Sequence, residues 1–106
     1  MKVTLLNTSI LTAFGTFNFA PVSLSEAKEL VKNSQIVSAI GHSATADVLS
    51  DLLEIEVKAN RIEFVQSVDE IALIFKLKTR ITEGKVLNRA EIEEIGYEFG
   101  ILRRLK

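Results

Sequence analysis

The only histidine of the chain, His42, lies at a predicted strand-to-helix junction. The short apolar run 36–40 predicts a buried strand, Gly41 interrupts it, and the pattern of an amphipathic helix follows. Ligands of open α/β sheets bind outside the carboxyl ends of strands, and the free N–H groups of a helix start favour an anion. An imidazole at such a corner can supply acid–base chemistry on a phosphate. The alternative is that His42 is a capping or packing residue.

A second group of candidate residues lies in the predicted loop 79–86, which carries Arg80, Glu83 and Lys85. An arginine holds a phosphate through two parallel hydrogen bonds and stays charged. A carboxylate can accept a proton or bind a ribose hydroxyl. With a histidine acid, these groups suffice to cleave an RNA phosphodiester without a metal, because the adjacent 2′-hydroxyl attacks phosphorus while the acid protonates the departing 5′-oxygen. The alternative is that Arg80 and Glu83 only pair across a surface loop.

Several other kinds of site are excluded by what the sequence lacks. With one histidine and no cysteine, the chain has no zinc pattern and no disulfide. It also lacks the glycine-rich phosphate loops of P-loop and dinucleotide-binding proteins. The segment from Gly41 to Thr45 lacks the second glycine of a serine nucleophile elbow, so the sequence disfavours a serine hydrolase. We therefore expect neither a metal nor a cofactor.

Length and composition predict one small domain that associates with itself. The chain has 106 residues, a hydrophobic content of 47% and a mean hydropathy of +0.24, which is high for a small monomer. No apolar run approaches the roughly 20 residues of a membrane span, so we expect a homodimer interface rather than a membrane partner. The net charge of −1 disfavours binding of duplex DNA. The absence of cysteine and of a signal-peptide pattern fits the cytoplasm.

The periodicity predicts an α/β fold, a mixed sheet flanked by about three helices in one domain spanning residues 1–106. Capping boxes at Ser23 and Asn88, each with a glutamate three residues later, mark two helix starts. We expect the first helix to open at Pro21-Val22-Ser23 and the last to end at Gly96. Segments 61–66 and 71–78 are predicted to be two strands that pair as a β-hairpin. The other predicted strands are 3–6, 36–40 and 97–105, segment 10–20 is extended, and the middle helix follows His42.

The two candidate segments together are similar to those of a known family. Ile-Gly-His-Ser-Ala-Thr at 40–45 and Arg-Ile-Thr-Glu-Gly-Lys-Val-Leu at 80–87 resemble the signature segments of the viral ring nucleases, the type III anti-CRISPR proteins. The resemblance extends along nearly the whole chain. It implies a homodimer that binds cyclic tetra-adenylate across its two-fold axis. Cleavage without a metal would give linear di-adenylate with a 2′,3′-cyclic phosphate, which switches off type III CRISPR signalling.

The resemblance also assigns roles to individual residues. His42 matches the general acid of the family, and Arg80 and Glu83 match its arginine and glutamate. Lys76 stands where a polar amide is expected and Ala44 where a serine can occur. The predicted ligand-binding residues are Asn7, Ser9, Gly41, Ser43, Thr45, Lys76 and Lys85, although Asn7 to Ser9 also fit an ordinary turn. Two other functions stay open: a cyclic-nucleotide-binding module without turnover, and a small nucleic-acid-binding regulator.

Overall fold

The computed structural model describes residues 2–78 and 88–106, which form one mixed sheet and three helices. The strands lie in the order β2-β5-β4-β1-β3. β1 pairs in parallel with β3 and β4, whereas β5 runs antiparallel to β4 and β2, so the predicted α/β class and mixed sheet are confirmed. The elements are β1 (Lys2–Leu6), β2 (Phe17–Val22), α1 (Leu24–Lys32), β3 (Gln35–Ser38), α2 (Ser43–Leu53), β4 (Ile71–Leu77), α3 (Arg89–Ile95) and β5 (Tyr97–Arg104).

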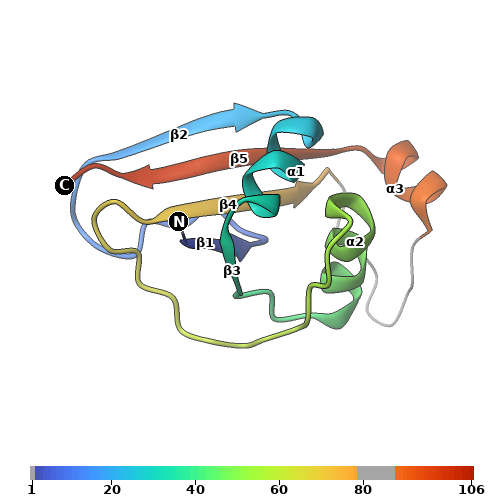
Figure 1. Cartoon of the computed structure of the whole chain (residues 1–106), viewed down its shortest axis with the longest axis horizontal. Helices are drawn as coiled ribbons and strands as arrows, with labels where there is room; N and C mark the ends of the chain where they lie inside the picture. The colour runs from blue at the N-terminus through green and yellow to red at the C-terminus, as the bar shows by residue number, and fades with distance from the viewer. Residues whose placement is uncertain (1, 79–87) are drawn as a thin grey trace.

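The two faces of the sheet are covered very differently (Figure 1). One face carries α1 and α2 and holds the main core, to which the central strands contribute Val3, Leu5, Leu73 and Phe75. The segment that joins β1 to β2 passes behind the other face in Figure 1. That face has only a small buried cluster, made of Leu6, Ala72, Ile74 and Leu102. In the described part of the chain, no helix is long and apolar enough to cross a membrane.

Both predicted capping boxes are present. Ser23 Oγ accepts the N–H of Glu26 at 3.1 Å, and the Glu26 carboxylate accepts the N–H of Ser23 at 3.0 Å. Asn88 and Glu91 make the same reciprocal pair at the start of α3. These contacts satisfy N–H groups that a helix start leaves without partners. α3 ends at Gly96, whose φ of 87° favours glycine.

The predicted start of the first helix is too early by two residues. Pro21 and Val22 belong to β2, and only from the N-cap Ser23 does the chain turn into α1. Proline is tolerated there because β2 is an edge strand, so its missing N–H costs no hydrogen bond of the sheet interior.

The predicted hairpin between 61–66 and 71–78 is wrong. Residues 61–66 form no strand, and β4 pairs with β1 and β5 instead. Segment 61–66 is instead irregular and is attached through Phe64, which packs against the small cluster on the face away from the helices. The buried Gln66 completes the attachment, because its amide nitrogen donates to the carbonyls of Glu70 at 3.0 Å and Leu102 at 2.8 Å.

β3 is shorter than predicted because it ends at Ser38 rather than at Ile40. Ser38 Oγ donates to the carbonyl of Lys58 at 2.6 Å and accepts the N–H of Ile40 at 3.3 Å. These bonds turn the chain out of the sheet two residues early. Ile40 stays fully buried in the main core.

Candidate active site

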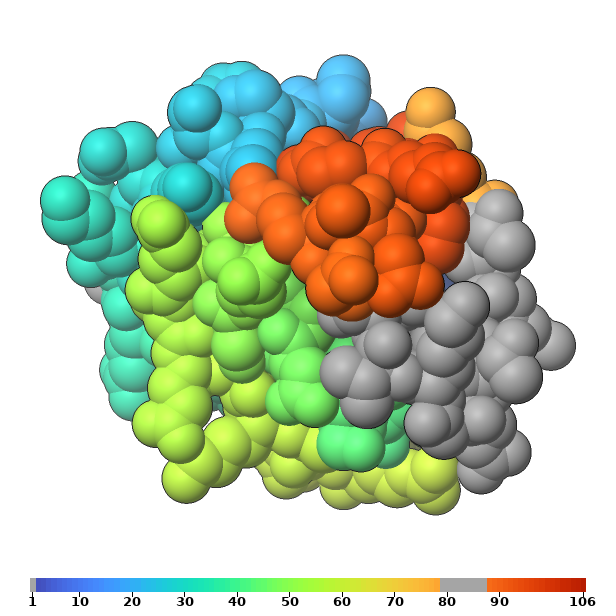
Figure 2. Space-filling view, turned by 90° about the vertical axis from the view of Figure 1, so that its right-hand side faces the viewer, coloured from blue at the N-terminus to red at the C-terminus, as the bar shows by residue number. Residues whose placement is uncertain are grey.

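The sheet has a topological switch point between β1 and β3. These strands are parallel neighbours, so their carboxyl ends meet at one edge of the sheet. The chain leaving β1 passes to the face away from the helices, whereas the chain leaving β3 enters α2 on the helical face (Figure 1). Such a divergence opens a crevice outside the strand ends, where ligands of α/β proteins bind. Figure 2 looks onto this end of the molecule, with α2 in green and α3 in orange.

The backbone between β3 and α2 is fixed by the segment that follows α2. The N–H of Asn60 donates to the carbonyl of Ile40 at 2.7 Å, and its side-chain amide donates to the carbonyl of Ser38 at 2.8 Å. On the other side, the N–H of Ala39 donates to the carbonyl of Leu5 at 3.0 Å. The chain therefore approaches His42 along a path that is held from both sides.

His42 is the N-cap residue of α2, but its imidazole does not cap the helix. The backbone is extended, with φ −122° and ψ 131°, and the carbonyl accepts the N–H of Ala46 at 3.1 Å. The side chain makes no capping hydrogen bond, whereas the side chains of Ser23 and Asn88 do, and it is exposed. The first turn of α2 also contains no acidic residue. Among the residues that the structure describes, the imidazole of His42 therefore neither caps α2 nor packs into the core.

Four of the predicted site residues lie together at this corner. Gly41 immediately precedes His42, and Ser43 and Thr45 belong to the first turn of α2. Ser43 is exposed and Thr45 is half-buried. An imidazole, two hydroxyls and the positive end of a helix are thus placed within a few residues, a combination that suits an anion.

The predicted ligands on the neighbouring strands are placed less closely. Asn7 directly follows β1 at the same edge and is half-buried, whereas Ser9 is exposed on the segment that leaves for the other face. Lys76 is exposed on β4, next to the buried Phe75, and lies opposite Glu98 of β5 in the register of the two strands. Opposite charges at directly opposed positions of two strands stabilise a sheet, which is the alternative reading for Lys76. Arg80, Glu83 and Lys85 lie outside the described residues.

Arg61 is a cation that the sequence analysis did not assign to the site. Its Nε donates to the carbonyl of Gly41 at 3.2 Å, so the guanidinium lies beside the corner that carries His42. The side chain is exposed, and none of the carboxylates in the described ranges forms an ion pair with it. Guanidinium groups bind phosphates well. No local pattern could have identified Arg61, because the contact joins residues 20 positions apart.

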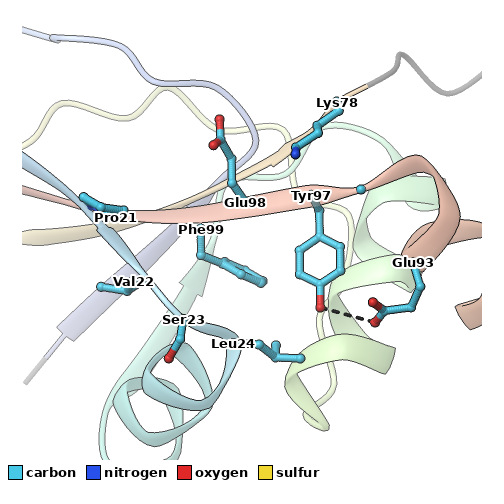
Figure 3. Close-up of a pocket in the computed structure, with 10 residues that line it drawn as sticks. Pro21, Val22, Ser23, Leu24, Lys78, Glu93, Tyr97, Glu98 and Phe99 are labelled. Carbon is cyan, nitrogen blue, oxygen red and sulfur yellow. Dashed lines mark hydrogen bonds between the residues drawn. The ribbon is translucent and has the colours of Figure 1, made fainter.

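A separate cavity of about 380 Å³ lies near the start of β5 and contains none of the predicted site residues (Figure 3). Within it, the hydroxyl of Tyr97 donates to Glu93 at 3.3 Å, and Arg89 donates to the same carboxylate at 2.9 Å. Burial and, next, the charge of Glu93 raise the pKa of Tyr97. The phenol therefore keeps its proton and donates it to the Glu93 carboxylate, which Arg89 also pairs, and such a group of mutually satisfied side chains is typical of a structural contact.

Known proteins share the fold of this chain and, in part, its sequence. A family model described as STIV B116-like matches residues 3–99. The uncharacterized protein ORF117 of Acidianus two-tailed virus is 42% identical over 93 residues, which cover 85% of this chain and 80% of that protein. The uncharacterized protein YddF of Bacillus subtilis is 32% identical over 99% of both chains. The structure of B116 of Sulfolobus turreted icosahedral virus superposes with a TM-score of 0.84 at 25% identity, covering 98% of this chain and all of that one.

Proposed function

The chain belongs to the STIV B116-like family, and from that premise we propose that it is a metal-independent ring nuclease. Its substrate is cyclic tetra-adenylate, which a homodimer binds across its two-fold axis. Cleavage gives linear di-adenylate with a 2′,3′-cyclic phosphate and so switches off type III CRISPR signalling. The observation that carries the proposal is the exposure of the His42 imidazole at the switch point between β1 and β3. The imidazole makes no capping hydrogen bond to α2.

The reaction needs an acid at the departing oxygen. The 2′-hydroxyl of one adenylate attacks its own 3′-phosphate, so a bond from phosphorus to the 2′-oxygen forms as the bond to the 5′-oxygen of the next adenylate breaks. The imidazolium of His42 gives its proton to that 5′-oxygen. The proton of the attacking hydroxyl goes to a base, for which Glu83 is the candidate from the sequence. The bonds and charges balance without a metal or an oxidant.

The surroundings of His42 support an anionic substrate on a chain whose net charge is −1. The first turn of α2 presents its N–H groups without an acidic residue to neutralise them. Arg61 adds a permanent positive charge next to Gly41. A few local cations, rather than a basic surface, are what a small cyclic ligand requires, whereas a duplex-binding regulator would normally be basic.

The homodimer is part of this proposal because each chain has a single histidine. A ring of four adenylates must be cut twice to give two di-adenylates. A two-fold axis through the ring places two His42 side chains at opposite phosphates, which one chain cannot do.

The test is to incubate the protein with cyclic tetra-adenylate in excess chelator and to identify the products by mass spectrometry. We expect linear di-adenylate with a cyclic phosphate end. Lys32→Ala, on the exposed side of α1, serves as a matched control and should cleave like the wild type. Binding of the ring without any product would support the sequestering module instead and refute the nuclease.

A further inference from the structure

β2 is an edge strand, and its outer side is free of other strands in the described part of the chain. It lies at one end of the strand order, next to β5 (Figure 1). The opposite edge, β3, is contacted by the segment after α2, because Asn60 donates its side-chain amide to the carbonyl of Ser38 at 2.8 Å and the carbonyl of Lys58 accepts from Ser38 Oγ at 2.6 Å. An unpaired strand edge is a template for pairing with another chain. β2 is therefore the edge at which the sheet can take an additional strand.

The alternation of hydrogen bonds along β2 determines which of its backbone groups face outward. Thr16, just before β2, bonds inward, since its carbonyl accepts the N–H of Leu105 at 2.7 Å. Residues of an antiparallel pair alternate between positions that bond to the partner strand and positions that do not. Phe17, Phe19 and Pro21 therefore direct their backbone groups outward. Pro21 fits this alternation because it has no N–H to lose, and it ends the row of free donors.

On the side away from the helices, an added strand would lie next to Phe19. The register of Phe19 opposite Leu102 places its ring on the side of the small buried cluster. The ring lies over Gly100, where an added Cβ would come within 2.5 Å of Phe19 Cε1, and Phe19 is 52% exposed. Aromatic and β-branched side chains pair favourably across neighbouring strands. The residues of an added strand on this side should therefore be β-branched or aromatic.

On the helical side, a groove of about 530 Å³ lies between α1 and the strands β2 and β5. Its apolar part is half-buried and is made of Val22, Leu30 and Ile101. Two exposed carboxylates of α1, Glu26 and Glu29, also line it. The hydrogen bonds to these carboxylates come from neutral N–H donors, and neither carboxylate forms an ion pair within the described residues. The groove therefore combines apolar walls with uncompensated negative charge.

The nearest described cations leave this negative charge available. Lys28 belongs to the side of α1 that faces α2, where it pairs with Glu54 at 3.2 Å. Lys32 of α1 does not line the groove. Arg103 lies farther along β5, opposite Asn18, so a cation from a partner belongs at the α1 end of β2. A lysine or arginine on an added strand can lay its aliphatic stem over the apolar walls and place its charged head at the carboxylates.

We propose that β2 and the groove beside α1 bind an extended segment of a partner protein that carries a basic residue among β-branched or aromatic ones. The segment pairs with the outward backbone groups of Phe17 and Phe19, which is recognition by strand addition. Its successive side chains point to opposite faces of the sheet, so the basic residue enters the groove while its neighbours meet Phe19. A second copy of β2 does not supply this pattern, because Phe-Asn-Phe-Ala-Pro-Val contains no basic residue. The proposal is independent of ring cleavage.

The probe is the end-blocked peptide Val-Thr-Val-Lys-Val-Thr-Val, which reads the same in both directions and so presupposes no strand orientation. Calorimetry measures its binding to the full chain. We expect saturable binding that weakens by about 5-fold when glutamate replaces the peptide lysine, since exposed charge pairs are individually weak. Methylating the peptide's backbone amides should weaken binding by about 10-fold or more, because the strand hydrogen bonds are then lost. Failure of the lysine peptide to bind, or equal binding of the methylated peptide, would overturn the proposal.

A charge exchange in the protein tests the groove itself. Glu29→Lys should abolish the preference for the lysine peptide over the glutamate peptide. Glu94→Lys makes the same exchange on an exposed residue of α3 outside the groove, and it should keep that preference. A preference that survives Glu29→Lys, or that Glu94→Lys abolishes equally, would overturn the assignment of the groove.

Amide hydrogen exchange followed by NMR locates the bound peptide. The N–H groups of Phe17 and Phe19 should exchange more slowly by about 10-fold or more when the peptide is added, because they become hydrogen-bonded donors. The N–H groups of Ile36 and Val37 on the other edge strand, β3, should not change. Unchanged exchange at Phe17 and Phe19 would overturn the proposal. Slow exchange of both groups in the protein without peptide would also overturn it, since a second copy of the chain would then occupy the edge.

Discussion

Arg61 donates its Nε to the carbonyl of Gly41 at 3.2 Å, and this bond places a guanidinium beside the one histidine of the protein. The contact does two things at the corner. The hydrogen bond fixes the carbonyl of Gly41, the residue before His42. The other guanidinium nitrogens remain near the carboxyl ends of the parallel strands, where ligands of α/β proteins bind. A phosphate bound by this guanidinium would lie next to Gly41, the residue before His42.

Replacing Arg61 by alanine should weaken binding of cyclic tetra-adenylate by about 10-fold or more, since a hydrogen bond to a charged group contributes roughly 1.5–3 kcal/mol. The affinity is best measured by calorimetry in a His42→Ala background, in which the ring is not consumed. Arg103→Ala is the matched control, because Arg103 is also an exposed arginine and lies near the carboxyl end of β5. An unchanged affinity in Arg61→Ala would show that the guanidinium does not touch the ligand.

Gln66→Met should destabilise the fold by about 2 kcal/mol. Methionine nearly preserves the volume but removes two hydrogen bonds, one buried and one half-buried, and a buried polar group left unpaired costs about 1–3 kcal/mol. The substitution also removes the side-chain oxygen of Gln66, which is buried without a partner among the described residues, and this offsets part of the loss. Gln66 is fully buried, so water cannot replace the lost donor. Urea denaturation followed by circular dichroism measures the change, with the exposed Ser67→Ala as the control. A midpoint equal to that of the wild type would contradict the role of Gln66 as an anchor of segment 61–66.

Tyr97 is the only tyrosine, and the chain has no tryptophan, so tyrosinate absorbance reports on this side chain alone. We expect its pKa to lie above the ordinary value of 10.0, because burial and then the charge of Glu93 favour the protonated phenol. Glu93→Gln should lower the pKa of Tyr97 toward that value, whereas Glu94→Gln, on the exposed neighbouring residue, should not. A pKa of Tyr97 at the ordinary value of 10.0 in the wild type would contradict the burial of the phenol and its contact with Glu93.

The same shift predicts how stability depends on alkaline pH. The folded state binds the phenolic proton more tightly than the unfolded chain does, so stability is retained below pH 10 and is lost as the pH rises toward the raised pKa of Tyr97. Tyr97→Phe should remove this part of the decline. Thermal melts between neutral and strongly alkaline pH measure it, and identical pH profiles for the two proteins would contradict the prediction.

The parts of the fold that were predicted from the sequence are those determined by neighbouring residues. Ser23 with Glu26 and Asn88 with Glu91 are three positions apart, and both form the capping boxes that their spacing predicts. The strand-to-helix junction at His42 was predicted because Gly41 interrupts an apolar run, although β3 proved shorter.

The parts that were missed depend on contacts between distant residues. Segment 61–66 looks like a strand, yet Phe64 and Gln66 bind to strands far away in the sequence. The contact between Arg61 and Gly41 arises only because the chain after α2 passes under the end of β3, where Asn60 and Lys58 bind Ser38. Local pattern cannot distinguish such attachment from strand pairing.

The rate of the chemical step should depend on pH through His42. An imidazole acts as an acid only while it carries its proton, so single-turnover cleavage should decline on the alkaline side of its profile. A profile with no alkaline decline would show that another group protonates the 5′-oxygen.

The most direct test of the account is single-turnover cleavage of cyclic tetra-adenylate in excess chelator by the wild type and by His42→Ala, with ring binding measured in parallel. The account predicts that the variant binds the ring as the wild type does and cleaves it more slowly by about 10²-fold or more, the usual scale of general acid catalysis. Cleavage by His42→Ala at the rate of the wild type would contradict it.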